Sequence, residues 1–248
     1  MSRRRCVGDR ALGAGGAAGT DMTVRPWELL GRARTPEGDE LTFMRQNTEY
    51  LISANGRSLM SSRVYGSEMS LAVLGCERAR SLAAPCVLIG GLGMGFTVRA
   101  ALDLLPAAAA VVVSELLPAV VEWNRGPLGE LTGYPLNDPR TTIEVGDIAV
   151  MLPANPGRFD AILLDVDNGP AAFTSPANAR LYGAAGLSSF RTALADGGVL
   201  AIWSAGDDPR FRQRLKAAGF SVRVERVRGR AAKRGPRHTV FLAQKLAG

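Results

Sequence analysis

Short apolar runs alternate with amphipathic segments along the chain from residue 86 onward. The runs are rich in Val, Ile and Leu, a composition typical of buried β-strands. They predict strands at residues 87–89, 111–114, 142–145, 161–164, 199–203, 221–227 and 239–243. Helical spacing between them predicts helices at residues 96–105, 118–124, 148–152, 178–194 and 209–218. This alternation predicts an α/β fold, a doubly wound and mostly parallel sheet of seven strands.

A different pattern precedes this region. Residues 40–63 contain short β-like runs, and Asn55-Gly56 has the composition of a hairpin turn. Residues 67–82 show helical spacing, with Ser67 in the position of an N-cap. We therefore expect a disordered tail at residues 1–21, a small β-rich N-terminal unit with a linking helix at residues 22–82, and the strand–helix domain at residues 83–248.

The composition is that of a globular protein. Of the 248 residues, 46% are apolar and 21% are charged, which is enough apolar surface for a core. No apolar run reaches the ~18 residues of a membrane span, so we expect none. Three unevenly spaced cysteines and one histidine exclude a disulfide framework and a Cys/His zinc site. Since Asp9 and Arg10 also interrupt any secretory signal, we expect a cytoplasmic protein without a metal.

Charge is unevenly distributed along a chain whose formal net charge is +7. Residues 209–248 hold 12 Lys and Arg against one acid, Glu225, whereas residues 22–208 are acidic overall. The basic side chains gather around the predicted hairpin of the last two strands: Arg223, Arg226, Arg228, Arg230, Lys233, Arg234 and Arg237. Such a hairpin is either a solvated surface or a contact for RNA phosphates, so RNA contact through residues 223–237 stays open.

Polar features follow four of the predicted strands. The first strand runs into Gly90-Gly91-Leu92-Gly93-Met94-Gly95 and a helix, so backbone amides can approach a ligand without β-carbons in the way. Glu115 ends the second strand, where doubly wound folds place a carboxylate against two ribose hydroxyls. Asp147 and Asp165 follow the third and fourth strands. Because parallel strands end at one edge of the sheet, we expect these groups to meet in a nucleoside-binding crevice.

These motifs resemble a known family. In chain order they are Gly90–Gly95, Glu115, Asp138-Pro139-Arg140, Gly146-Asp147, residues 159–165 and Leu181-Tyr182. They resemble the AdoMet-dependent class I transferases, which have a Rossmann-like sheet, and within them the spermidine synthase (polyamine aminopropyltransferase) family.

The resemblance implies a cofactor and roles for the motif residues. The cofactor would be S-adenosylmethionine (AdoMet) or decarboxylated S-adenosylmethionine. The resemblance assigns Gly91, Gly93 and Gly95 to the cofactor's tail, Glu115 to the ribose and Asp147 to the adenine amino group. Asp165 would be the catalytic aspartate beside the sulfonium. A homodimer through the N-terminal unit is expected from the resemblance alone.

A carboxylate at position 165 suits transfer to an amine. A primary ammonium with a pKa of ~10.4 has no lone pair, and freeing one at pH 7 costs roughly 4.6 kcal/mol. Asp165 can hold this cation, orient it toward the sulfonium carbon, and take or relay its proton. Asp167 suits a second ammonium, and Asn168 offers a neutral acceptor. Tyr182 is either a wall of the acceptor pocket or a core aromatic.

Two enzymatic functions follow, with a third, non-enzymatic one. The first is spermidine synthase-like transfer of an aminopropyl group from decarboxylated AdoMet to an amine acceptor such as putrescine. The alternative is an AdoMet-dependent methyltransferase acting on a small molecule or RNA. Gly93 and Asn168 favour the alternative. The family usually has an aspartate where this chain has Gly93, and the last aspartate of its D-x-x-D motif corresponds to Asn168 here. The third is nucleoside binding without catalysis. His238 is either structural or directed into the site.

Overall fold

The computed structural model describes residues 25–166, 169, 180–229 and 235–246. The predicted tail at residues 1–21, the predicted site residues Asp167 and Asn168, and the basic residues Arg230, Lys233 and Arg234 lie outside the described residues.

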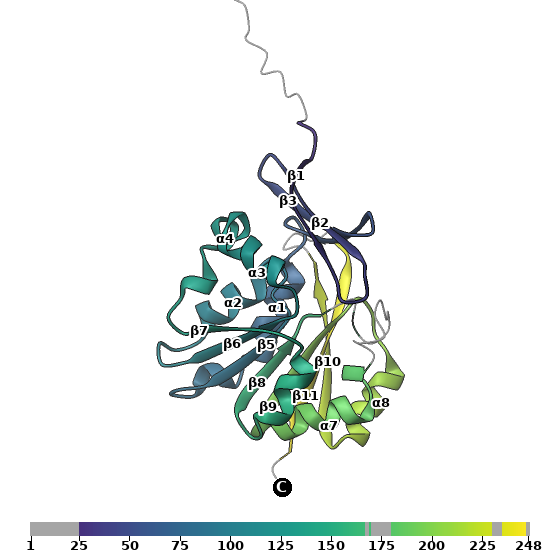
Figure 1. Ribbon diagram of the computed structural model, residues 1–248. Coiled ribbons are helices and arrows are strands. Elements are labelled where there is room, and N and C mark those ends of the chain that lie inside the picture. The colour runs from purple at the N-terminus through teal and green to yellow at the C-terminus, as the bar shows by residue number, and fades with distance from the viewer. Residues whose placement is uncertain (1–24, 167–168, 170–179, 230–234, 247–248) are drawn as a thin grey trace, which may run out of the picture.

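The predicted seven-stranded doubly wound sheet is confirmed. Its strands are β5 (Cys86–Gly90), β6 (Ala110–Glu115), β7 (Thr141–Val145), β8 (Phe159–Leu164), β9 (Leu194–Ser204), β10 (Phe220–Arg228) and β11 (Arg237–Lys245). They lie in the order β10-β11-β9-β8-β5-β6-β7 (Figure 1). The five strands from β9 to β7 are parallel, and β11 is antiparallel to both β9 and β10. The chain leaves β5 for β6 on one side and later returns to β8 on the other, which makes β5 the switch point where ligands bind in such sheets.

Helices cover both faces of this sheet. They are α1 (Gly66–Gly75), α2 (Phe96–Leu104), α3 (Pro118–Arg125), α4 (Pro127–Thr132), α5 (Ile148–Met151), α7 (Ala184–Ala193) and α8 (Pro209–Ala217). Alternate residues of β5 enter different cores: Val87 and Ile89 pack with α1, α2 and α3, whereas Leu88 packs with α7 and α8. This follows from the two-residue period of a strand, and it explains why the central strands are apolar throughout. Within the described residues, no helix is long and apolar enough to cross a membrane.

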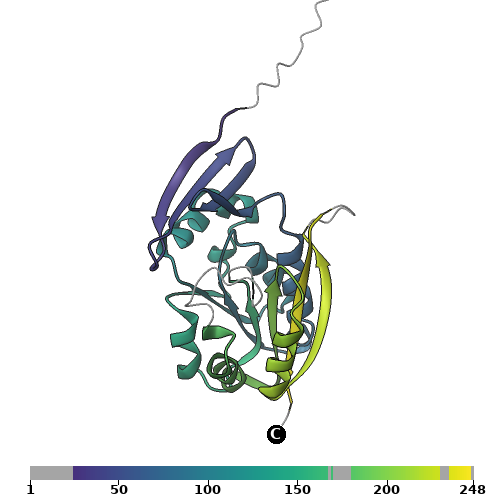
Figure 2. The same cartoon turned by 90° about the vertical axis from the view of Figure 1, so that its right-hand side faces the viewer.

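Four more strands form a separate antiparallel sheet, here called the N-terminal sheet. It consists of β1 (Glu28–Arg34), β2 (Glu40–Gln46), β3 (Glu49–Ala54) and β4 (Arg57–Ser61) in sequential order. Figures 1 and 2 show it beyond one end of the larger sheet. The predicted turn at Asn55-Gly56 is confirmed, with φ values of 48° and 74°. Phe43 stacks on Trp123 of α3 with ring centroids 5.0 Å apart, which fixes the N-terminal sheet over α3.

Several predicted elements were wrong in their bounds. The helix predicted at residues 67–82 ends at Gly75, and a 3-10 turn follows at Ala79–Ser81. A β-carbon at Gly75 would meet the side chain of Leu163 at 2.1 Å, so the end of α1 presses directly on the sheet. Ser67 is not the N-cap, because α1 begins one residue before it.

The helix predicted at residues 178–194 and the strand predicted at residues 199–203 also differ from the structure. The described part of that segment, residues 180–194, is not one helix, since Gly183 has extended backbone angles and α7 begins after it. β9 begins at Leu194 and not at residue 199, because it already pairs with Phe159 there. β1 was missed, since Gly31 and two arginines interrupt its apolar pattern.

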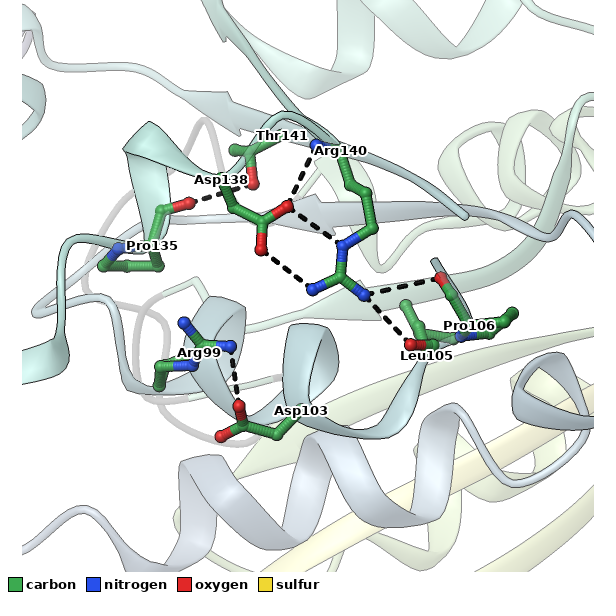
Figure 3. Close-up of polar contacts among 8 residues, drawn as sticks. All are labelled: Arg99, Asp103, Leu105, Pro106, Pro135, Asp138, Arg140 and Thr141. Atoms are coloured by element: carbon green, nitrogen blue, oxygen red, sulfur yellow. Dashed lines mark hydrogen bonds and ion pairs between the residues drawn. The ribbon is translucent and has the colours of Figure 1, made fainter. Parts of the chain in front are cut away.

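The Asp138-Pro139-Arg140 motif is a structural clasp (Figure 3). Arg140 forms a two-pronged ion pair with Asp138, from Nη2 to Oδ2 at 2.8 Å and from Nε to Oδ1 at 2.9 Å. The third arm of its guanidinium, Nη1, donates to the carbonyl of Leu105 just after α2, at 2.9 Å. The hydrogen bonds from Arg140 lower the pKa of Asp138 to about 2. The clasp therefore ties the chain before β7 to the end of α2, away from the crevice.

Candidate functional site

The glycine loop Gly90–Gly95 crosses the carboxyl ends of the central strands. Gly91 N–H donates to the Ser114 carbonyl in β6 at 2.9 Å, and Asp165 N–H donates to the Gly90 carbonyl at 2.8 Å. Gly91 has a φ of +88°, and a β-carbon there would lie 2.4 Å from the Asp165 carbonyl oxygen. Only glycine fits this approach, so the loop and Asp165 are held against each other.

The other two predicted glycines differ in position. Gly93 lines the cavity described below, with a φ of +52°. Gly95 does not line it: it precedes α2, and a β-carbon there would meet Asn124 Oδ1 at 2.7 Å. The fully buried Asn124 donates from Nδ2 to the Gly93 carbonyl at 2.9 Å, which fixes the loop to α3. Asn124 was missed because a single asparagine in a helix gives no distinctive signal in the sequence.

Glu115 lies directly beneath the glycine loop. Its carboxylate accepts hydrogen bonds from Leu92 N–H at 2.8 Å and Leu117 N–H at 2.9 Å. Burial raises the pKa of Glu115, although these backbone hydrogen bonds oppose the shift. The carboxylate also lines the cavity described below, where its oxygens can accept from the hydroxyls of a ligand. This geometry suits the predicted contact with a ribose.

Asp147 and Asp165 stand at the same edge of the sheet. Asp147 is exposed at the start of α5, where its Oδ1 accepts from Ala149 N–H at 2.8 Å. Asp165 accepts from the hydroxyl of Thr97 in α2 at 2.7 Å. Burial raises the pKa of Asp165 to about 6, against the hydrogen bond from Thr97, which lowers it. Asp165 is thus a half-buried carboxylate at the switch point, held by one hydroxyl.

Glu68 is a second acid beside Asp165 that the sequence analysis did not assign. It lies in the first turn of α1 and accepts from the Ser67 hydroxyl at 2.8 Å. Burial, together with the neighbouring charge of Asp165, raises the pKa of Glu68 to about 7. The only signal in the sequence was its presence in the segment Tyr65-Gly66-Ser67-Glu68, ahead of a helix.

These groups surround one cavity of about 580 Å³ between the N-terminal sheet and the glycine loop. Its volume is that of a pocket for a small molecule or cofactor. The described lining includes six carboxylates and one histidine: Glu37, Asp39, Glu68, Glu115, Asp147, Asp165 and His238. Among the lining residues that the structure describes, none is Lys or Arg. In a chain with net charge +7, the cavity is therefore strongly acidic.

Trp203 and His238 form the wall of the cavity on the side of β9 and β11. Their rings lie 4.8 Å apart, and burial lowers the pKa of His238. His238 therefore lies in the site. Tyr182 does not line the cavity: it is fully buried, packs edge-on against Phe211, and donates from its hydroxyl to the Val166 carbonyl at 3.3 Å. Its contact supports the segment that follows Asp165.

Comparison with solved structures shows what this fold resembles. A crystal structure of spermidine synthase in complex with the transition state analogue AdoDATO superposes with a TM-score of 0.69 at 18% identity, covering 88% of this chain and 73% of that one. Spermidine synthase from Thermotoga maritima gives a TM-score of 0.65 at 20% identity, covering 88% and 72%. No protein-family model matches the sequence, and no match was found among curated proteins. The chain therefore has a spermidine synthase-like fold.

Proposed function

We propose that the protein is an AdoMet-type alkyl transferase that moves an aminopropyl group from decarboxylated AdoMet to an amine acceptor such as putrescine. The observation that carries this proposal is the acidic cavity at the switch point. A sulfonium donor and an ammonium acceptor are both cations, and the described lining offers them six carboxylates without a Lys or Arg. Phosphate-bearing ligands would be repelled by the same lining.

The residues present fit a sulfonium nucleoside. Glu115 lines the cavity with a carboxylate suited to two ribose hydroxyls, Asp147 stands at the same edge of the sheet for the adenine amino group, and Gly91 and Gly93 leave backbone exposed for the tail. When bound, the donor supplies an alkyl carbon made electrophilic by the positive sulfur. Asp165 holds the acceptor's ammonium, directs its nitrogen toward that carbon, and takes or relays its proton.

Methyl transfer from intact AdoMet is a second candidate, and one contact favours it. The space beside Gly93 is filled by Met60 of β4, whose Sδ lies 3.1 Å from the position of a glycine β-carbon. An apolar thioether therefore stands where an aspartate at position 93 would hold the ammonium of a decarboxylated tail. On this alternative, an RNA substrate would contact the basic residues of the β10–β11 hairpin, outside the acidic cavity.

A calorimetric titration with decarboxylated AdoMet and, separately, AdoMet tests the proposal. We expect saturable binding of both, tighter for the decarboxylated form, because the acidic cavity disfavours a carboxylate on the ligand. Product formation with a panel of diamines should follow. Tighter binding of intact AdoMet would move the assignment to methyl transfer, and binding of neither would refute both.

A further inference from the structure

Glu68 is held firmly at the cavity by the start of α1. Gly66 N–H donates to the Gly229 carbonyl at 2.9 Å, and Tyr65 stacks on Phe96 with ring centroids 4.3 Å apart. The Ser67 hydroxyl then bonds the carboxylate itself. Glu68 therefore approaches Asp165 from a different element, α1, while Asp165 stands at the end of β8.

Both carboxylates lack a cation within the described residues. Each accepts a hydrogen bond from a neutral hydroxyl, Thr97 for Asp165 and Ser67 for Glu68, and neither takes part in any of the ion pairs of the described chain. Two half-buried acids that line one cavity repel each other unless a proton or a cation is shared between them. Their arrangement fits a single ammonium held by both.

The remaining ionisable groups of the cavity do not supply that cation. Facing the pair from the other elements are Glu115 at the end of β6, Asp147 after β7, Glu37 and Asp39 between β1 and β2, and His238 on β11. Four are acids, and burial disfavours the charged form of the histidine. Within the described part of the chain no cation faces the pair, so the ammonium of a ligand can take that place.

We propose that Glu68 is the proton acceptor for the acceptor amine, and that Asp165 holds the nitrogen during transfer. This inference rests on the proposed function and adds a catalytic residue to it. As the nitrogen is freed, one N–H bond breaks and its proton passes to the Glu68 carboxylate. The nitrogen lone pair then forms the C–N bond, the C–S bond breaks, and its electron pair stays on the neutral thioether sulfur. Glu68 later gives the proton to solvent.

The division of roles follows from the positions of the two acids. Asp165 is held against the glycine loop, which on the proposed function carries the donor, so its carboxylate can place the nitrogen beside the alkyl carbon. Glu68 comes to the cavity from α1 and has no contact with that loop among the hydrogen bonds of the described residues. Burial and the neighbouring charge of Asp165 raise the pKa of Glu68 to about 7, and a base is most effective when its pKa is close to the working pH.

Proton release on binding of a simple amine tests this assignment apart from turnover. The probe is n-butylamine, titrated calorimetrically near pH 6 into protein saturated with 5′-methylthioadenosine, the thioether left once the donor has lost its aminopropyl group. Measurements in two buffers of different ionisation enthalpy give the protons released. We expect release from the unaltered protein, at least a twofold reduction in Glu68→Gln, and no change in Glu130→Gln, an exposed residue on α4.

The outcomes separate the two proposals. No binding of n-butylamine to the unaltered protein would overturn the proposed function together with the role of Glu68. Binding with the same proton release in Glu68→Gln would overturn the role of Glu68 alone. Where turnover is measured, Glu68→Gln should lower kcat/KM about a hundredfold near neutral pH and remove an ionisation near pH 7 from its pH profile, while Glu68→Asp should restore part of both.

Discussion

Two pairs of charged residues in this molecule contain an aspartate from the same set of sequence motifs, yet their environments are opposite. At the clasp, Asp138 is met by the guanidinium of Arg140, and its pKa falls to about 2. At the cavity, Asp165 is met by a hydroxyl and by a second acid, Glu68, and its pKa rises to about 6. The clasp satisfies its carboxylate within the protein, whereas the cavity leaves its carboxylates for a ligand.

This difference separates a structural motif from a functional one. A carboxylate whose partners are all internal stabilises the fold and has nothing left to bind. A carboxylate removed from water without a cation costs stability, and such a cost at the switch point of the sheet, where ligands bind, indicates function. Substitutions at the two pairs should therefore act in opposite ways, on stability at one and on chemistry at the other.

The largest expected effect is that of Asp165→Asn. Asparagine keeps the size of the side chain and can still bond Thr97, but it removes the charge that holds an ammonium. On the proposed function we expect turnover to fall by about a thousandfold, because the amine is no longer held in line with the alkyl carbon, with nucleoside binding nearly unchanged. Turnover and calorimetric binding of 5′-methylthioadenosine measure the two effects. Full activity in this variant would remove Asp165 from the mechanism.

Arg140→Ala should have the next largest effect, on stability. The change leaves Asp138 without its ion pair and the Leu105 carbonyl without its donor, in a region where both charged side chains are mostly buried. We expect a loss of about 2–3 kcal/mol in the free energy of unfolding, measured by urea denaturation.

Arg125→Ala is the matched control for the clasp. Arg125 pairs with Glu122 on the exposed surface of α3, so its loss should cost under about 1 kcal/mol. If the two variants lose the same stability, the clasp is no more than a surface ion pair. Nucleoside affinity should change in neither, because both residues lie outside the cavity.

The free energy of unfolding should change with pH in opposite directions at the two pairs. The folded pKa of Asp138 is lowered, so its stabilisation is present above its unfolded pKa near 4 and is lost as pH falls toward 2. The folded pKa values of Asp165 and Glu68 are raised, so their favourable contribution is present below about pH 4 and is lost as pH rises to 6–7.

Chemical denaturation of the ligand-free protein between about pH 4 and pH 8 measures this loss. We expect the free energy of unfolding to fall by on the order of 2 kcal/mol across that range from the pair at the cavity. In the double variant Glu68→Gln, Asp165→Asn, the fall should largely disappear. If the free energy of unfolding of that variant falls with pH as steeply as that of the unaltered protein, the fall does not come from Glu68 and Asp165.

Much of the fold, and part of the candidate site, can be predicted from the sequence. Val, Ile and Leu runs and helical spacing were sufficient for the seven-stranded sheet, because burial on both faces produces a strong pattern. The order of Gly91, Glu115, Asp147 and Asp165 was sufficient to bring four groups to one edge, since parallel strands end together. β1 was missed because its side chains are mostly exposed or half-buried and carry little pattern.

The sequence could not distinguish a clasp from a catalytic acid. Asp138 and Asp165 are both aspartates near strands, and only the distance to Arg140 or to Glu68 gives them different roles. Glu68 was missed because its partner is almost a hundred residues away in the chain. Contacts between distant segments, such as that between Met60 and Gly93, leave no mark in a single sequence.

The smallest effect expected is at this last contact, and it bears on which donor the cavity prefers. Gly93→Asp places a side chain at a φ of +52° and 3.1 Å from Met60 Sδ, so we expect a loss of about 1 kcal/mol of stability. Adding Met60→Ala should recover part of that loss because it opens the space, whereas adding Met60→Leu, which keeps the volume, should recover little.

The same double variant tests whether Met60 sets the donor preference. If it does, Gly93→Asp with Met60→Ala should have a higher ratio of affinity for decarboxylated AdoMet to affinity for AdoMet than the unaltered chain has, measured by calorimetry. An added carboxylate favours a tail that carries only an ammonium and repels one that also carries a carboxylate. An unchanged ratio of the two affinities would show that the tail does not lie against Gly93, and it would leave the acids at Glu68 and Asp165 to act on the acceptor alone.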